Sequence, residues 1–402
     1  MCIICSRFHD SGRITCFFLV ALIPISLLTL SACEEPVPLV KVLPDPATDP
    51  GYVGWATVGN GTFGASELDP VVVTTKNGFI NAISGSKQKL VIVKGTINLG
   101  TGYFDLGSNK TIRGWHDPAN PADNGVLCQG TIKISGQSNV ILQNLTICDA
   151  RDPNPVWDPE DGSGAWNTNY DCIAISGSTR VWVDHCEIYN TPISEAEYIG
   201  IYGSNTHYEP YYCYDGLLDI TNGSNYVTVS YCNVYNNSKT CLLGSSDSST
   251  VDSGKLKVTW HHNYFHDAGS RGPRVRFGKV HIYNNYYLDF SSAIGRGDYA
   301  EIYSEGNYFH RLNAASMRPF LVYDDTGNRG YAYDTGSMTL DCNLVTEPSN
   351  TALRPLLATA PTWTPSAYYT YTPDTFTDAG QAATWATALI SQAGPREYIH
   401  VP

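Results

Sequence analysis

The sequence predicts an all-β protein folded as a right-handed parallel β-helix, with long loops and a short C-terminal helix. Two observations predict it. Short alternating apolar segments recur together with an asparagine at a fixed spacing, as in a solenoid. Helical periodicity is almost absent until the last part of the chain.

The repeat is clearest at Asn263, Asn285 and Asn307, which are 22 residues apart. Each follows a segment in which apolar residues alternate, and each precedes a tyrosine and a second aromatic residue. A β-propeller is the rival interpretation, but its repeats are longer, about 40–50 residues. Asparagines at the same turn of successive coils can stack as an amide ladder and satisfy one another's buried polar groups. We therefore expect these three to be structural.

The N-terminal 33 residues resemble a bacterial lipoprotein signal peptide rather than part of the fold. Arg7 and Arg13 precede an apolar run that is too short for a membrane span and ends at Cys33. Cys33 would carry the lipid anchor, and ordinary secretory cleavage near Ala32 is the alternative. Either way the protein is exported, as an envelope lipoprotein or a secreted protein. Proline-rich residues 34–50 predict a tether, residues 51–345 the β-helix domain, and residues 346–402 a flanking segment packed on the solenoid.

Composition limits the possible partners. The net charge of −13 excludes nucleic-acid binding through the overall field, so an acidic substrate would need a local cationic site or a bridging metal. Eight cysteines lie beyond Cys33, an even number that predicts disulfides in an exported chain. The only Cys-x-x-Cys pair lies in the signal segment, which argues against a zinc site.

Two long insertions interrupt the predicted coils. Residues 149–169 are acidic and contain tryptophan and proline, and residues 191–214 contain six tyrosines. Loops of this length in a solenoid usually shape a binding face. Near the C-terminus, residues 378–394 have the apolar spacing of an amphipathic helix that would cover a flank of the solenoid.

The residues best suited to chemistry lie between Asp215 and Arg276. Two aspartates occur in Asp215-Gly-Leu-Leu-Asp219, Lys239 follows, and then Arg271-Gly-Pro-Arg-Val-Arg276. Carboxylates can hold a hard cation, and guanidinium groups can hold a carboxylate. Together they suit a reaction on an acidic sugar.

Several motifs in order resemble the family 1 pectate lyases, from about residue 51 to residue 309. The resemblance rests on these segments: Gly51-Tyr-Val-Gly-Trp55-Ala, Gly61-Thr-Phe-Gly64, Ile92-Val-Lys-Gly95-Thr-Ile97, Asp171-Cys-Ile-Ala-Ile175, Val181-Trp-Val-Asp-His185, Asp215-Gly-Leu-Leu-Asp219, Lys239 and Arg271-x-Pro273-x-x-Arg276. It implies calcium-dependent cleavage of α-1,4-linked polygalacturonate by β-elimination, which yields 4,5-unsaturated oligogalacturonides. We also expect a monomer that contacts a membrane only through the lipid anchor at Cys33.

The resemblance assigns the residues as follows. Asp171, Asp215 and Asp219 are the Ca²⁺ ligands. Some family members carry a further acid two residues before the first of these, where this chain has Asn169. Three clustered carboxylates need such a cation, since a like pair at ~4 Å and an effective dielectric near 20 costs about 4 kcal/mol.

Among the basic residues, Arg271 removes the C5 proton, and Lys239 and Arg276 bind the substrate carboxylate. Water or hydroxide is an alternative base, with Arg271 as electrostatic support. His185 and the pair His261–His262 are interpreted as structural, and Arg274 as lying outside the site.

Two other functions stay open. A pectin lyase acting on methyl esters would have the same fold without calcium, but the three aspartates argue against it. A non-catalytic receptor for oligouronides is the other, and the set Lys239, Arg271 and Arg276 argues against it.

Overall fold

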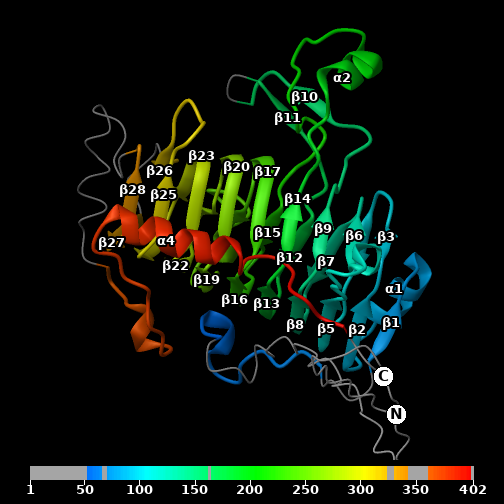
Figure 1. Cartoon of the computed structure of the whole chain (residues 1–402), viewed down its shortest axis with the longest axis horizontal. Helices are drawn as coiled ribbons and strands as arrows, with labels where there is room; N and C mark the ends of the chain where they lie inside the picture. The colour runs from blue at the N-terminus through cyan, green and yellow to red at the C-terminus, as the bar shows by residue number, and fades with distance from the viewer. Residues whose placement is uncertain (1–51, 66–69, 162–163, 324–329, 343–360, 400–402) are drawn as a thin grey trace, which may run out of the picture. The chain divides into compact units, whose positions relative to one another are not determined.

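Parallel strands stacked coil upon coil form the body of the described structure (Figure 1). This computed structural model describes residues 52–65, 70–161, 164–323, 330–342 and 361–399. All described elements belong to the unit Val40–Pro402. The predicted signal segment with Cys33, the tether and the boundary at residue 345 lie outside the described residues. Over the residues that the structure describes, no helix has the length and hydropathy needed to cross a membrane.

One sheet contributes a strand to each coil, and its inward column is built of β-branched residues. Val140, Val181, Val227, Val258 and Val280 are paired in register from coil to coil, and all five are fully buried. Such side chains pack well on a pleated surface, which explains the alternating segments. In the described chain this sheet has ten strands: β1 (Val71–Val73), β2 (Lys89–Val93), β5 (Lys110–Gly114), β8 (Ser138–Gln143), β13 (Thr179–Asp184), β16 (Asn225–Ser230), β19 (Val258–His261), β22 (Lys279–Tyr283), β24 (Ala300–Glu305) and β27 (Gly330–Thr335).

The second sheet folds into two rows that share the long strand β23 (Tyr286–Arg296). One row consists of β3 (Thr96–Asn98), β6 (Val126–Cys128), β9 (Thr146–Cys148), β14 (Glu187–Tyr189), β17 (Asn233–Lys239), β20 (Tyr264–Ser270), β25 (Tyr308–His310) and β28 (Met338–Leu340). The other consists of β4 (Tyr103–Asp105), β7 (Thr131–Ser135), β12 (Ile173–Ser176), β15 (Leu218–Thr221), β18 (Leu242–Leu243), β21 (Arg274–Val275) and β26 (Arg318–Val322). We call the outer face of this last row the groove sheet. These sheets confirm the predicted parallel β-helix.

The asparagine ladder is present. The Asn285 Oδ1 accepts the backbone N–H of Asn263 at 3.0 Å and its Nδ2 at 2.9 Å. The Asn307 Oδ1 accepts the same two groups of Asn285 at 2.9 and 3.0 Å. All three side chains are fully buried, so the structural interpretation is confirmed.

Replacing the middle residue of the ladder should destabilise the fold. Asn285→Ala removes the acceptor of the Asn263 backbone N–H, one of the two acceptors of the Asn263 Nδ2, and the side-chain donor to the Trp260 carbonyl, all in a buried site. Each orphaned group costs about 1–3 kcal/mol, so we expect the free energy of unfolding to fall by about 3–5 kcal/mol in urea titrations. Asn60→Ala, at an exposed position, is the control. A loss below about 1 kcal/mol for Asn285→Ala would contradict the structural role.

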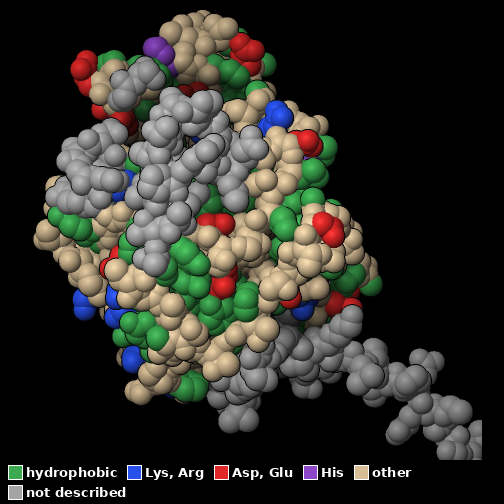
Figure 2. Space-filling model, turned by 90° about the vertical axis from the view of Figure 1, so that its left-hand side faces the viewer, with side chains coloured by type: hydrophobic (Ala, Val, Ile, Leu, Met, Phe, Trp, Pro, Cys, Tyr) green, Lys and Arg blue, Asp and Glu red, His purple; other side chains and the backbone are tan. Residues whose placement is uncertain are grey.

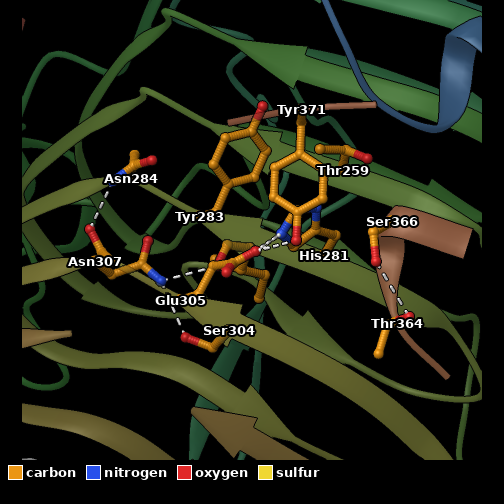
Figure 3. Close-up of polar contacts among 12 residues, drawn as sticks. Thr259, His281, Tyr283, Asn284, Ser304, Glu305, Asn307, Thr364, Ser366 and Tyr371 are labelled. Atoms are coloured by element: carbon orange, nitrogen blue, oxygen red, sulfur yellow. Dashed lines mark hydrogen bonds and ion pairs between the residues drawn. The ribbon is translucent and has the colours of Figure 1, made fainter. Parts of the chain in front are cut away.

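The C-terminal segment crosses the outer face of the ten-stranded sheet and is fastened there by a buried polar cluster (Figure 3). The His281 Nε2 lies 2.8 Å from the Glu305 Oε1, which also accepts the Tyr371 hydroxyl. The His281 Nδ1 lies 2.8 Å from the Tyr369 hydroxyl, which in turn lies 3.0 Å from the Thr259 hydroxyl. Burial lowers the pKa of His281 although Glu305 opposes this. The cluster holds residues 369–371 against the coils.

The predicted C-terminal helix is α4 (Ala379–Ile390), and its N-terminus is capped by Asp378, which accepts the Gln381 N–H at 2.9 Å. Ala382, Ala386 and Leu389 bury against tyrosines of the second sheet, which agrees with the predicted apolar face. The remaining helices are short: η1 (Trp55–Thr57), α1 (Lys76–Ile83), η2 (Pro121–Asp123), α2 (Glu195–Tyr202), η3 (Thr250–Asp252) and η4 (Pro365–Ala367).

The two insertions fold together as a cap above the coils, with the hairpin β10 (Val156–Asp158) and β11 (Ala165–Asn167) beside α2 (Figure 1). Trp166, Tyr198 and Tyr212 from both insertions form its aromatic core. Acidic side chains gather on its upper surface (Figure 2). The tyrosines noted in the sequence therefore serve first to pack the cap.

The expectation of disulfides is wrong for the residues that the structure describes. These cysteines are unpaired: Cys128, Cys148, Cys172, Cys186, Cys213, Cys232, Cys241 and Cys342. Four of them lie in the interior of the coils, where they pack between aliphatic side chains as small apolar groups: Cys172, Cys186, Cys232 and Cys241. Hydrophobic stacking of coils, rather than cross-linking, holds this fold.

Candidate active site

Three acids meet on the groove sheet because they lie at the same point of adjacent coils. Asp171 lies two residues before β12, Asp215 lies three residues before β15, and Asp219 lies on β15 opposite Ala174. The Asp171 Oδ1 accepts the Gly216 N–H at 2.9 Å, and the Asp219 Oδ1 accepts the Leu242 N–H at 3.0 Å.

Gly216 lies between two of these carboxylates. A Cβ atom there would come within 2.6 Å of the Asp219 Oδ1 and 2.8 Å of the Asp171 Oδ1. A side chain at this position would push the carboxylates apart, so glycine is required for the acids to approach each other. In the described structure the carboxylate of Asp215 accepts no hydrogen bond.

All three acids have a raised pKa, and burial is the largest cause. Burial, followed by the charges of Asp219 and Asp215, raises the pKa of Asp171 well above its ordinary value. Burial and Asp215 raise the pKa of Asp219 to about 7. Burial also raises the pKa of Asp215, although Lys239 and Arg271 oppose it. Without a cation, the cluster therefore favours its protonated form.

Lys239 and Arg271 bring positive charge to the acids from the next coils. Lys239 ends β17, and its Nζ donates to the Trp166 carbonyl of the cap at 3.0 Å. Arg271 is half-buried between β20 and β21, and its charge lowers the pKa of all three acids. Among described residues its guanidinium forms no hydrogen bond or ion pair, so its donors are available to a ligand.

Arg276 is held by a residue that the sequence did not reveal. Its Nε lies 2.7 Å from the Asp247 Oδ1, and its Nη1 donates to the Gly244 carbonyl at 3.1 Å. Asp247 lies in the connection after β18, and no motif marked it.

Arg274 does not point away from its neighbours as expected, because it shares Asp247 with Arg276. Its Nη2 lies 3.5 Å from the Asp247 Oδ2, and its guanidinium lies 4.2 Å from the centre of the Tyr323 ring. Burial and the charge of Arg276 lower the pKa of Arg274 to about 10. A strand period of two places Arg274 and Arg276 on the same face, with Val275 inward, and this signal was available in the sequence.

The structure thus brings together the six residues singled out in the sequence: Asp171, Asp215, Asp219, Lys239, Arg271 and Arg276. Within the described ranges, no three His, Cys, Asp or Glu side chains already stand as a metal-ligand set. His185 is buried with its Nδ1 2.8 Å from the Asp184 Oδ2, and the His261 and His262 Nδ1 atoms are 3.0 Å apart. These histidines belong to the ten-stranded sheet and its turn, away from the groove sheet.

Comparison with known proteins identifies the family. A family model described as pectate lyase matches residues 25–394 of the chain. The chain belongs to the pectate lyase family. The enzyme is 34% identical over 407 residues to pectate lyase D of Dickeya chrysanthemi, covering 96% of this chain and 97% of the relative. It is 31% identical over 378 residues to a pectate lyase of Bacillus subtilis strain 168, covering 78% of this chain and 87% of the relative.

Solved structures agree with this polysaccharide lyase assignment. A mutant pectate lyase of Bacillus subtilis superposes with a TM-score of 0.69 at 27% identity, covering 88% of this chain and all of the other (100%). A pectate lyase bound to a hexasaccharide superposes with a TM-score of 0.68 at 27% identity and the same coverage, 88% and 100%. These relatives support the parallel β-helix and pectate lyase activity.

Proposed function

We propose that the enzyme is a calcium-dependent lyase that cleaves α-1,4-linked polygalacturonate by β-elimination and releases 4,5-unsaturated oligogalacturonides. The observation that carries the proposal is the meeting of Asp171, Asp215 and Asp219 with Arg271 and Lys239 on one face of adjacent coils. The structural relative bound to a hexasaccharide supports a saccharide chain as substrate.

The acids fit Ca²⁺ by their chemistry. They offer only oxygen atoms, and Ca²⁺ takes about six to eight oxygens at flexible geometry. Three aspartates leave ligand positions for water and for substrate oxygens. Burial, and after it repulsion by the neighbouring aspartates, raises the pKa values of Asp171 and Asp219, and a cation would relieve that repulsion. Asn169, where some relatives carry a fourth acid, forms hydrogen bonds to Asp152 instead, at 3.0 and 2.8 Å.

The reaction follows from the charges in the groove. Arg276 and Lys239 bind substrate carboxylates, the first through a planar fork and the second as a point charge. Bound Ca²⁺ would withdraw charge from the C6 carboxylate and make the C5 proton more acidic. Arg271 takes that proton, the C4–O bond breaks with its electron pair going to the leaving oxygen, and a C4–C5 double bond forms. The base role of Arg271 rests on the family resemblance, and a guanidinium without a hydrogen-bond partner among the described residues can face the substrate.

The location of the enzyme is proposed from the sequence alone. Cys33 carries the lipid anchor of an exported protein, residues 34–50 tether the domain of residues 51–345, and residues 346–402 flank it. The enzyme acts as a monomer on a polygalacturonate chain and binds no nucleic acid, in keeping with its net charge of −13.

A direct assay tests the function. The mature protein is incubated with polygalacturonate at about pH 8.5 with millimolar Ca²⁺, and the unsaturated product is followed by ultraviolet absorbance. We expect product with Ca²⁺ and none after chelation. Absence of product under both conditions contradicts the lyase and leaves the receptor, which binds without cleavage. Product that survives chelation or forms mainly from methyl-esterified pectin indicates a pectin lyase instead.

A further inference from the structure

A cation lies on the groove sheet on the side of the acids opposite the arginines. Lys133 on β7 is paired with Ala174 on β12, which is paired with Asp219 on β15. Beyond Asp219, the same register continues through Leu242 to Arg274. Since neighbouring strands are about 4.8 Å apart, Lys133 and Arg274 each lie on the order of 10 Å from the strand of Asp219, on opposite sides.

Lys133 has no anionic partner in the described protein. Its ammonium forms no hydrogen bond or ion pair with a described residue and lies 4.7 Å from the centre of the Tyr103 ring. The neighbouring carboxylate in register is Asp105 on β4, which is exposed and does not pair with it. A half-buried lysine without a counter-ion is a ready site for an anion.

The aromatic ring beneath Lys133 is fixed beside the acids. Tyr103 donates its hydroxyl to the Asn169 carbonyl and lies 5.1 Å from the Tyr170 ring. Burial and the charge of Asp171 raise the pKa of Tyr103, as expected of a phenol close to the acid cluster. Tyr103 is still 46% exposed, so a ligand in the groove can reach it. Ala174 lies between Lys133 and Asp219, and its small methyl side chain leaves room for a ligand above this part of the groove sheet.

We propose that Lys133 and Tyr103 form an additional subsite for one uronate unit of the substrate chain. Lys133 pairs with the carboxylate of that unit, and the Tyr103 ring packs against the C–H face of the sugar. A polyuronate running across the strands then meets cations on both sides of the acids. This deepens the proposed function and rests on it, since it assumes that the chain carries a carboxylate on every unit.

Removing the positive charge of Lys133 and the negative charge of Asp105 should change KM in opposite directions, which tests the subsite. Lys133→Gln should raise KM for polygalacturonate about three- to fivefold with kcat within twofold, as for a partly exposed ion pair. Lys133→Arg should restore KM, and Asp105→Asn should lower it. The effects should shrink between 50 and 500 mM salt because exposed charges are screened. Lys255→Gln, an exposed lysine outside the groove sheet, is the matched control.

Several outcomes would overturn the subsite. They are a KM for Lys133→Gln within twofold of wild type, an equal change in Lys255→Gln, or a rise in KM for both Lys133→Gln and Asp105→Asn. Calorimetry with hexagalacturonate separates this failure from that of the proposed function. If the wild type binds the hexamer without cleaving it, the lyase proposal fails, and the affinity of Lys133→Gln for the hexamer still decides the subsite.

Discussion

Arg271→Ala should lower kcat by about 10²–10⁴, the usual contribution of a positioned general base. The substituted side chain is half-buried between β20 and β21 and has no hydrogen-bond partner in the described chain. Its removal therefore breaks no contact of the fold, and the melting temperature should stay close to that of the wild type. KM should change much less than kcat, because Lys239 and Arg276 still bind carboxylates.

Chemical rescue distinguishes proton abstraction from electrostatic support. Guanidinium groups ordinarily titrate above about pH 12, so the wild-type rate should rise with pH up to an alkaline optimum. Added guanidine or small amines should restore part of the rate of Arg271→Ala, and the rescue should increase with the concentration of free base. If hydroxide is the base, the variant responds to pH alone and added amines have no effect.

Arg180→Ala is the matched control, since Arg180 is a half-buried arginine on β13 of the ten-stranded sheet. It should retain wild-type kcat. A decrease of less than tenfold in Arg271→Ala would show that another group removes the proton.

The repeating part of the fold could be predicted from the sequence because its energetics are local and periodic. Val140, Val181 and Val227 recur with the strand period, and one asparagine per coil marks the turn at which amides stack. Each coil buries its residues against the next, so a pattern along the chain becomes a column in space. The motifs also singled out acidic and basic residues that the structure brings to one face of adjacent coils.

The parts of the site that could not be predicted depend on contacts between segments that do not belong to the sequence repeat. Asp247 reaches Arg276 from the connection after β18, and Lys133 acquires its place only through the register of β7 with β12. Neither residue is exceptional in the sequence. The disulfide prediction failed for another reason. An even number of cysteines in an exported chain predicts disulfides, but Cys172 and Cys232 lie at inward positions where a thiol packs like a small aliphatic group.

Calcium should control both activity and stability, and the sign of its pH dependence follows from the acids. Folding raises the pKa of Asp219 to about 7, above the ordinary value near 3.9. The folded, calcium-free protein therefore holds a proton that the unfolded chain releases. The contribution of Asp219 to the stability of the calcium-free protein is fully present at low pH and is lost as pH rises from about 4 through 7.

Calcium reverses that loss, since it binds the ionised acids. At a hundred times the dissociation constant it should add about 2.7 kcal/mol, so the melting temperature should rise by several degrees at pH 8 and much less at pH 5. Chelation should reduce kcat at least about 10²-fold, in line with the loss of a principal electrostatic contribution. Scanning calorimetry with Ca²⁺ and with chelator measures the change in melting temperature. The absorbance assay measures the change in kcat.

Asp219→Asn separates the metal from the fold. The amide cannot ionise, so without calcium this variant should be more stable than the wild type at pH 8, yet it should lose both the calcium-induced rise in melting temperature and the activity. Glu209→Gln, an exposed change on the cap, should behave as wild type in both respects. A calcium response in Asp219→Asn equal to that of the wild type would place the ion elsewhere. Asp219→Asn should therefore gain stability and lose activity. This combination is expected only if the fold holds the three acids together, at a cost in stability, to bind a cation.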